Sequence, residues 1–523
     1  MHLSDSGLVT SPTDLANFLG CHHQTSLDRR AALGQLKKAF RFDPLTDVLR
    51  QRGEAHERSY IDGLRQKGLR VEVLRDVARE EAAPRLRAAM QQGADVIVQP
   101  PLTGEGWSGY ADVLRRIEAP SPVLGTWSYE VHDTKLARDT HGGTILQLCL
   151  YSELLGALQD SIPSHFRIVT PVAVESYRFD DFAAFYRQVK ARFLDHLASP
   201  DEGEYPELVE HCDACRWWER CNGRRRADDH LCFVAGMGRL QQAELESRDV
   251  ATMAALAGMG VPLAFKPRHG SVGIYERLRD QAVLQVRHRE SGRLEYELLT
   301  VQDGQGLALL PEPAAGDLFL DLEGDPFACE GGREYLFGLG RVDAGGRFQY
   351  TARWASTAEE ERAAFEATID QIMAARREHE GVHIYHYAPY EPSAMKRLMG
   401  RYAVRGVEID ELLRAGRFVD LYAVVRHALR AGVEHYSIKN MEPFYLFERE
   451  VPLDEAGTNR RLFESALELQ DWSAITADVR NAVEGYNRDD CRSTLHLRNW
   501  LEHLRAGLLA DGREILRPVP KSG

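Results

Sequence analysis

The sequence lacks any apolar run long enough to predict a transmembrane helix. Its most hydrophobic stretch, residues 144–158, is interrupted by Gln147, Ser152 and Glu153, whereas a spanning helix needs about 20 mainly apolar residues. The first residues also lack the basic and apolar regions of a secretory signal peptide. We therefore expect a cytoplasmic protein that does not enter a membrane.

The sequence also has fewer basic than acidic residues. The 523 residues include 65 Lys and Arg against 79 Asp and Glu, which gives a formal net charge of −14. This balance excludes a generally basic nucleic-acid binder, but it leaves room for local basic segments such as Arg220 and residues 224–226. With 44% hydrophobic and 28% charged residues, the chain is expected to fold into roughly two to four domains.

Cysteine is scarce, and half of the cysteines follow no pattern. Four of the eight are scattered, and in a reducing compartment we expect them to be free thiols: Cys149, Cys232, Cys329 and Cys491. The others are Cys21 and a Cys-x2-Cys-x5-Cys group at Cys212, Cys215 and Cys221. Thiolates at this spacing hold a metal or an iron–sulfur cluster. A structural zinc ion is the alternative, its fourth ligand being Cys21, His22, His23 or His211.

Between these cysteines lie two carboxylates and a lysine with the pattern of a metal-dependent hydrolase. Asp112 ends a Gly-Tyr-Ala-Asp segment and precedes Asp133-Thr134-Lys135 by 21 residues. Residues 127–135 have the pattern of a strand, along which side chains alternate, so Asp133 and Lys135 should point to one face. Two carboxylates can hold Mg²⁺ or Mn²⁺ against a phosphate, and the ammonium group can orient water and stabilise transition-state charge. The pattern predicts phosphodiester hydrolysis.

This region, from about Cys21 to Cys221, resembles the PD-(D/E)XK nucleases of the RecB branch. Gly53-Glu54-Ala55-His56 is similar to that branch's G-x-x-H element, which implies His56 as an additional metal ligand. Gln147 and Tyr151 resemble its Q-x3-Y helix, and because residues four apart share a helix face, we expect both to face the substrate. The one-plus-three cysteines resemble those of iron–sulfur nucleases of the AddB kind. That resemblance implies a structural 4Fe-4S cluster held by Cys21, Cys212, Cys215 and Cys221.

A second set of carboxylates follows residue 316. Residues 317–323 form an apolar strand that ends in Asp-x-Glu, so Asp321 and Glu323 should project from one face. Tyr486 and Asp490 lie one helical turn apart much further along. Clustered carboxylates can hold two metal ions, and a tyrosine hydroxyl can help to place the attacking water. These motifs resemble the first and last motifs of DnaQ-like DEDD exonucleases, which implies 3′ to 5′ polarity.

The middle motif departs from that family's pattern. An aspartate should follow a strand, but residues 386–391 offer Glu391, whose side chain is one methylene longer. We expect Glu391 to coordinate metal. Asp420 is a second candidate, which we interpret as a helix cap, and Asp325 before a proline is interpreted as a turn residue.

Proline and glycine mark a linker at residues 311–316. Strands are expected at residues 95–99, 107–115 and 127–135 before it, and at 318–323, 334–342, 347–354 and 382–387 after it. We predict a mixed α/β fold: a PD-(D/E)XK restriction-endonuclease-like core and a ribonuclease H-like α/β domain. A mainly helical linker with features of a degenerate helix-hairpin-helix joins them. The predicted domains are residues 1–229, 230–312 and 313–508, with a tail at 509–523.

Over nearly its whole length the chain resembles a bacterial family of RecB-like nucleases, many of which continue into a superfamily 1 helicase. The chain contains no Gly-x4-Gly-Lys-[Ser/Thr] phosphate loop, so it cannot supply that motor itself. We expect either a shorter relative, whose helicase would be supplied in trans, or a piece that ends at the domain edge. The resemblance implies a nuclease in DNA processing, repair or defence, with single-stranded or end-containing DNA as the expected substrate. The alternative is a nucleic-acid clamp or scaffold whose ribonuclease H-like domain is catalytically dead, as Glu391 suggests.

Overall fold

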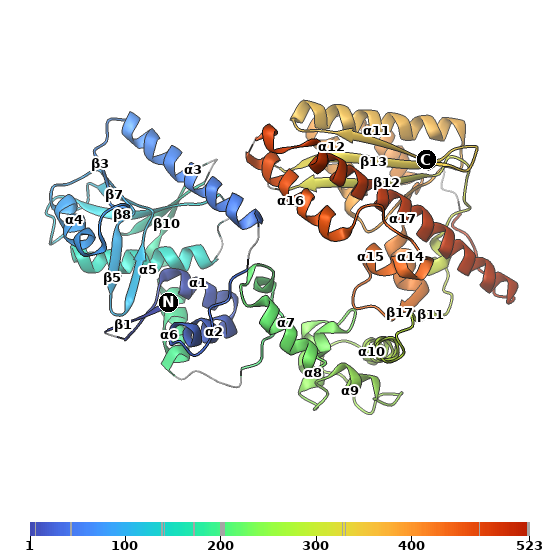
Figure 1. Ribbon diagram of the computed structural model, residues 1–523, viewed down its shortest axis with the longest axis horizontal. Helices are drawn as coiled ribbons and strands as arrows, with labels where there is room; N and C mark the ends of the chain where they lie inside the picture. The colour runs from blue at the N-terminus through green and yellow to red at the C-terminus, as the bar shows by residue number, and fades with distance from the viewer. Residues whose placement is uncertain are drawn as a thin grey trace. The chain divides into compact units, whose positions relative to one another are not determined.

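The computed structural model is a mixed α/β structure with two compact units, Met1–Ala227 and Asp228–Gly523 (Figure 1). It describes residues 1–5, 7–41, 44–136, 140, 142–170, 173–198, 204–326, 328–329, 331–469 and 471–519, without the side chains of residues 44–49, 79 and 469. Among the helices so described, none is long and apolar enough to cross a membrane.

A six-stranded sheet forms the centre of the first unit, in the order β10-β9-β8-β7-β4-β3. Strands β3 and β4 are parallel, as are β8 and β9, and the other neighbours are antiparallel. The strands are β3 (Val71–Val73), β4 (Val96–Val98), β7 (Val113–Ile117), β8 (Ser128–Thr134), β9 (His165–Val169) and β10 (Val174–Arg178). Two hairpins lie outside it: β1 (His2–Ser4) with β2 (Gly7–Val9), and β5 (Pro101–Gly104) with β6 (Trp107–Tyr110).

Helices cover both faces of this sheet, as Figure 1 shows for α3 and α5. Helix α5 is apolar on nearly all sides, and it is buried between β8 and α6. Helix α3 packs on the other face, where Ile61 and Leu64 contact Val98 and Val113. The helices are α1 (Pro12–Gly20), α2 (His22–Ala32), α3 (Pro44–Gln66), α4 (Arg79–Gln91), α5 (Gly142–Gln159), α6 (Phe179–Ala198), η1 (Glu210–Ala214) and α7 (Trp218–Ala227).

The single strand expected at residues 107–115 was wrong, because the structure divides it into β6 and β7. Strand β6 pairs with β5 in a separate hairpin, whereas β7 pairs with β4 and β8 in the main sheet. The chain changes partners at Ala111 and Asp112, and the backbone oxygen of Asp112 accepts the N–H of Gln99 there. Asp112 therefore lies at a break in the strand, next to the end of β8.

A five-stranded sheet forms the centre of the second unit, in the order β14-β13-β12-β15-β16. Strands β12, β13 and β14 are antiparallel and consecutive, and β15 and β16 add in parallel. The strands are β12 (Leu318–Asp325), β13 (Arg333–Val342), β14 (Phe348–Trp354), β15 (Ile384–His386) and β16 (Phe418–Asp420). The four strands expected at residues 318–323, 334–342, 347–354 and 382–387 are confirmed as β12, β13, β14 and β15. Asp325 was wrongly placed in a turn, because β12 continues past a bulge at Glu323/Gly324 and pairs Asp325 with Arg333.

Alternate residues of β12 belong to two different cores. Leu318, Leu320 and Leu322 pack with α11, whereas Phe319 packs with residues of α17. Figure 1 shows α11 and α17 on either side of the sheet. Asp321 and Glu323 share the face of Phe319, so their side chains point toward α17. The helices are α11 (Ala358–Glu378), α12 (Tyr390–Tyr402), α13 (Gly406–Arg414), α14 (Leu421–Ala428), α15 (Ile438–Met441), α16 (Leu453–Leu469) and α17 (Ala477–Ala510).

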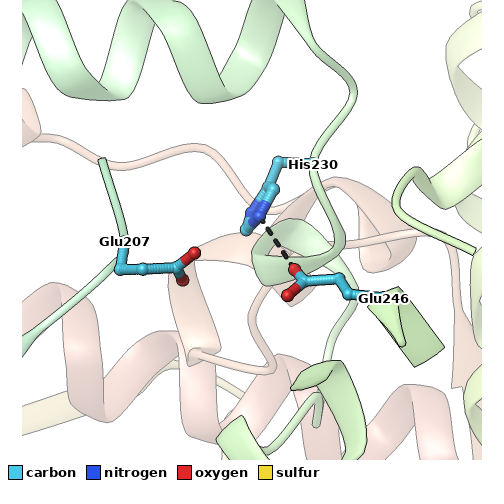
Figure 2. A group of neighbouring side chains, drawn as sticks. All are labelled: Glu207, His230 and Glu246. Atoms are coloured by element: carbon cyan, nitrogen blue, oxygen red, sulfur yellow. Dashed lines mark ion pairs between the residues drawn. The ribbon is translucent and has the colours of Figure 1, made fainter. Parts of the chain in front are cut away.

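The segment before this sheet is mainly helical. It contains η2 (Leu231–Phe233), α8 (Arg239–Glu246), α9 (Met253–Ala257) and α10 (Val272–Ser291), which share a small apolar core. His230 Nε2 lies 3.3 Å from Glu246 Oε1 and so joins the start of η2 to the end of α8 (Figure 2). Strand β11 (Tyr296–Leu298) then pairs with β17 (Leu429–Ala431). This segment is therefore attached to the second unit by a sheet as well as by the chain.

Candidate metal sites

Three carboxylates of the second unit meet at one point. Asp321 and Glu323 come from β12, and Asp490 comes from the facing side of α17. One oxygen atom from each carboxylate lies within 4.8 Å of the other two. Glu323 and Asp490 are buried, and Asp321 is half-buried. Carboxylate oxygens are the ligands that Mg²⁺ and Mn²⁺ prefer, so this group can hold a divalent ion.

Asn487 positions Asp321 within this group. Its Nδ2 donates to Asp321 Oδ2 at 2.7 Å, and its Oδ1 accepts from the hydroxyl of Tyr350 at 2.7 Å. The side chain fits because residue 338 of β13 is glycine, where a Cβ would lie 1.7 Å from Asn487 Oδ1. No local pattern in the sequence points to Asn487, although it adjoins Tyr486, because its role depends on how α17 packs on β13.

Two cations lie beside Asp490. Lys439 Nζ lies 3.3 Å from Asp490 Oδ2, and Arg449 Nη2 lies 2.5 Å from Oδ1. Both cations lie over the ring of Tyr486, with Lys439 Nζ 4.9 Å from its centre. The sequence carries no signal for these two cations either, since they precede Asp490 by 51 and 41 residues and belong to no motif. They offset part of the negative charge of the carboxylates.

Burial and mutual repulsion oppose ionisation of these carboxylates. Burial raises the pKa of both Asp321 and Glu323, and the charge of Asp490 raises both further. The cations Arg460 and Lys439 lower the pKa of Glu323, but they do not cancel the effect of burial. A divalent ion would favour the ionised carboxylates, so the electrostatics of the group suit a metal site.

Glu391 lies next to this group without joining it. It is buried in the first turn of α12, with Oε2 3.5 Å from His386 Nδ1. Its charge contributes to the raised pKa of Asp321, but the carboxylates that meet within 4.8 Å do not include it. Asp420, the other candidate, caps α14: its Oδ1 accepts the N–H of Tyr422 and that of Ala388, both at 2.9 Å. The interpretation of Asp420 as a helix cap is confirmed.

A cleft of about 500 Å³ opens beside Asp321 and Asp490. Its other walls carry aromatic and basic side chains, among them Tyr387, Tyr422, Arg426, His435, Tyr436 and Lys439. Aromatic rings can stack on nucleobases, and basic groups can bind the phosphates between them. The cleft therefore combines carboxylates that can hold a divalent ion with aromatic and basic side chains of the kind that bind a single strand of nucleic acid.

In the first unit, two carboxylates and the lysine lie together at the junction of β6, β7 and β8. Asp112 Oδ2 accepts from the backbone N–H and from the hydroxyl of Thr134, both at 2.8 Å. Asp133 is buried, and Lys135 Nζ lies 2.7 Å from its Oδ2. The expectation that Asp133 and Lys135 point to one face is confirmed. Burial, with the charge of Asp112, raises the pKa of Asp133 to about 7.

Tyr151 lies beside these carboxylates. Burial raises the pKa of Tyr151, and the charges of Asp133 and Asp112 raise it further. Its hydroxyl donates to a backbone oxygen at the end of β6 at 2.8 Å. Gln147, one turn earlier on α5, instead donates from Nε2 to Thr13 Oγ1 of α1 at 3.2 Å. The structure thus places the tyrosine of this predicted pair at the site, and uses the glutamine to hold α1.

His56 is hydrogen-bonded to the backbone near Lys135. Its Nε2 lies 2.9 Å from Val169 O, which also accepts the N–H of Lys135 at 3.0 Å. Helix α3 covers the sheet face opposite to Asp133, because Tyr60, one turn further on, hydrogen-bonds the alternate residue of β8. Over the described part of the chain, no three ligand atoms within 4.8 Å of one another include this pair of carboxylates. His56 is therefore near the site without joining its acidic groups.

The four patterned cysteines line one small cavity with Gln24 and Trp217: Cys21, Cys212, Cys215 and Cys221. Cys21 lies between α1 and α2, and the others lie in or beside η1 and α7, so the cavity joins the two ends of the unit. Among the described residues, no three cysteine sulfurs lie within 4.8 Å of one another. Sulfur ligands of a tetrahedral zinc ion would lie about 3.8 Å apart, given Zn–S bonds of about 2.3 Å. A compact zinc site is not preformed, and no disulfide joins these cysteines.

Comparison with known proteins adds one finding. Residues 318–502 match the family model of the RNase_H superfamily, and this segment runs from β12 into α17 and contains the three-carboxylate group. The second unit therefore contains a ribonuclease H-like domain of a class that processes nucleic acid. A search of the curated proteins finds no match.

Proposed function

We propose that this protein is a metal-dependent nuclease that hydrolyses phosphodiester bonds of nucleic acid. The observation that carries the proposal is the convergence of Asp321, Glu323 and Asp490 within 4.8 Å, inside the segment that matches the RNase_H superfamily. Two Mg²⁺ or Mn²⁺ ions bound there would stabilise the attacking and leaving oxygens of the displacement. Glu391 would complete the ligand set from α12.

The side chains around the carboxylates have separate roles in this proposal. Tyr486, next to Asp490 on α17, would orient the attacking water through its hydroxyl. Lys439 lines the cleft beside Asp490 and would bind a phosphate oxygen of the substrate. Asn487 holds Asp321 in position by hydrogen bonding. The resemblance to DEDD exonucleases assigns this module 3′ to 5′ polarity.

The first unit would supply a second nuclease site of the RecB-like PD-(D/E)XK type. Asp112 and Asp133 would hold the divalent ion, and Lys135 would stabilise the charge that develops on the phosphate. The contact of Lys135 with Asp133 and the raised pKa of Asp133 support this assignment. His56 would assist metal binding, and Gln147 and Tyr151 would face the substrate, for which Gln147 would have to give up its hydrogen bond to Thr13 Oγ1. His56 would have to exchange its hydrogen bond to Val169 O for a metal ligand.

The cysteine cavity would hold a 4Fe-4S cluster that ties the ends of the first unit together. Support comes from the four thiols that line one cavity from both ends of the unit. Anaerobically purified protein should then be brown and contain iron and inorganic sulfide. A colourless, folded preparation with one equivalent of zinc would establish the structural zinc site instead.

These assignments imply a domain organisation and a biological setting. A RecB-like domain at residues 1–229 would be followed by a helical linker at 230–312, an exonuclease domain at 313–508 and a tail. Single-stranded or end-containing DNA is the proposed substrate, in DNA processing, repair or defence. A helicase supplied in trans would provide such strands.

A nucleic-acid clamp with an inactive ribonuclease H-like domain is the second candidate. The observation that favours it is that Glu391 stays outside the three-carboxylate group while Arg449 and Lys439 occupy both oxygens of Asp490. Digestion of 5′-labelled single-stranded DNA by the Lys135→Ala protein separates the two candidates. Progressive shortening from the 3′ end in Mg²⁺ or Mn²⁺ supports the exonuclease, and an intact strand that stays bound supports the clamp.

A further inference from the structure

A basic pocket lies beside the cysteine cavity, within the first unit. Its volume is about 510 Å³, and residues of α2 and α7 form its walls. Six basic or acidic side chains line it: Arg29, Arg30, Arg220, Arg224, His23 and Glu204. Four guanidinium groups therefore share a pocket with one carboxylate.

Three of these arginines have no acidic partner in the described part of the chain. Arg29, Arg30 and Arg220 form no ion pair there, and Arg30 and Arg220 are exposed. The single carboxylate, Glu204, contacts Ser26 Oγ at 3.2 Å and lies 3.8 Å from His23 Nδ1. The pocket therefore keeps an excess of positive charge that described acidic groups do not neutralise.

Helix position accounts for some of these arginines but not for all. Arg29 and Arg30 lie in the last turn of α2, and Arg224 lies in the last turn of α7, where the helix dipole favours cations. Arg220 lies in the first turn of α7, where the dipole disfavours a cation and instead attracts anions. Helix stability therefore does not explain Arg220, whereas an anion held in the pocket does.

We propose that this pocket binds a phosphate group of the nucleic-acid strand; the choice of ligand rests on the proposed nuclease function. Guanidinium groups bind phosphate oxygens through paired, charge-assisted hydrogen bonds. Arg30 and Arg220 approach from different helices, so together they can hold one phosphate from two sides. The phosphate belongs either to the strand backbone or to its 5′ end. The pocket would hold the strand without taking part in bond cleavage.

Another role is available to these arginines. Cys221 lines both this pocket and the cysteine cavity, so the guanidinium groups could offset the negative charge of a metal group bound by the thiolates. Replacing the arginines by neutral residues distinguishes phosphate binding from charge compensation, because each role predicts the loss of a different property. Loss of phosphate binding lowers DNA affinity alone, whereas loss of charge compensation lowers the metal content.

The test is equilibrium binding of fluorescein-labelled single-stranded DNA to the full chain, without added Mg²⁺ or Mn²⁺, over a range of salt concentrations. The Arg30→Gln/Arg220→Gln protein is compared with wild type and with Arg187→Gln, a variant of an exposed arginine on α6 outside the pocket. The double variant should bind more weakly, and the slope of log affinity against log salt should fall by roughly 0.7 for each phosphate that the protein no longer neutralises. The control should not change.

Metal content and thermal midpoint are measured on the same samples. An unchanged salt slope, or loss of bound metal together with affinity, would overturn the proposal. Oligonucleotides with a 5′-phosphate and a 5′-hydroxyl identify the source, since a defect confined to the former assigns the pocket to the strand end. This binding assay does not depend on hydrolysis. If the double variant binds DNA more weakly but the wild-type protein never cleaves DNA, the proposed nuclease function is wrong and the proposed phosphate-binding pocket is still supported.

Discussion

At the scale of single residues, replacing Lys135 should distinguish metal binding from catalysis. Its ammonium group pairs with Asp133, but an ammonium cannot itself be a metal ligand. Lys135→Met should therefore keep the Mn²⁺-induced rise in thermal midpoint and lower cleavage by the first unit about 10²- to 10³-fold, as removal of a transition-state donor does elsewhere. The assay is DNA cleavage in an Asp321→Ala/Glu323→Ala background, with Lys67→Met as the exposed control. Unchanged cleavage would remove Lys135 from the mechanism.

The buried carboxyl of Asp133 predicts a pH dependence of stability. Its pKa rises from 3.8 to about 7 in the folded, metal-free protein, so the folded state binds more protons than the unfolded state between these values. The free energy of unfolding should therefore fall as pH rises from about 4 to 7. The raised pKa values of Asp321 and Glu323 act in the same direction.

Thermal midpoints with and without Mn²⁺ check this dependence. The stabilisation by Mn²⁺ should be larger at pH 8 than at pH 5, because the ion competes with protons for the carboxylates. In metal-free buffer at pH 8, Asp133→Asn should unfold a few degrees higher than wild type, since 1 kcal/mol corresponds to roughly 2–4 °C for a domain of this size. A midpoint for this variant that is lower than wild type at pH 8 would contradict the assignment.

At the scale of secondary-structure elements, the two candidates for the middle acidic residue belong to different helices. Glu391 lies in the first turn of α12, and Asp420 caps α14. Asp420→Ala removes the cap of α14 and should lower the free energy of unfolding by about 0.5–2 kcal/mol, with the exonuclease rate per folded molecule preserved. Glu391→Gln should abolish 3′ shortening while the domain stays folded. Denaturant unfolding and 5′-labelled digestion measure both effects. The reverse pattern would transfer the catalytic role to Asp420.

The packing of α17 on β13 is a second test at this scale. In Gly338→Ala the added Cβ displaces Asn487, which releases Asp321 and overpacks the core at a cost of about 1–3 kcal/mol. Exonuclease activity should fall together with stability. Gly457→Ala is the matched control, because a Cβ there meets open space within α16; it should leave activity intact and raise stability by about 0.5–1 kcal/mol. Full activity of the Gly338→Ala protein would show that Asn487 is dispensable.

The hydrophobic periodicity of the sequence predicted the strands and the helix that carry the acidic residues. It did not predict the side chains that hold those acidic residues in position. The alternation along residues 127–135 placed Asp133 and Lys135 together, and the Asp-x-Glu strand placed Asp321 and Glu323 on one face. The contact of Asn487 depends on the absence of a Cβ on another strand, and no local pattern in the sequence encodes that pairing. Likewise, the strand expected at residues 107–115 divides because its two halves find different partners.

At the scale of the whole molecule, the chain carries two acidic centres in two separate units. Each unit has its own sheet and its own core. The second unit matches the RNase_H superfamily over residues 318–502, whereas the assignment of the first rests on the arrangement of Asp112, Asp133 and Lys135. A chain built in this way should lose its two activities independently, because mutations at sites without shared partners act additively.

The central claim is that both centres hydrolyse nucleic acid. It is tested most directly by the release of labelled nucleotides from single-stranded DNA in Mn²⁺ by four proteins: wild type, Asp133→Asn, Asp321→Asn and the double variant. Each single variant should keep the activity of the intact unit, with 3′ shortening lost only when Asp321 is replaced. The double variant should release nothing above the background without protein. Nucleotide release by the double variant at the wild-type rate would contradict the account.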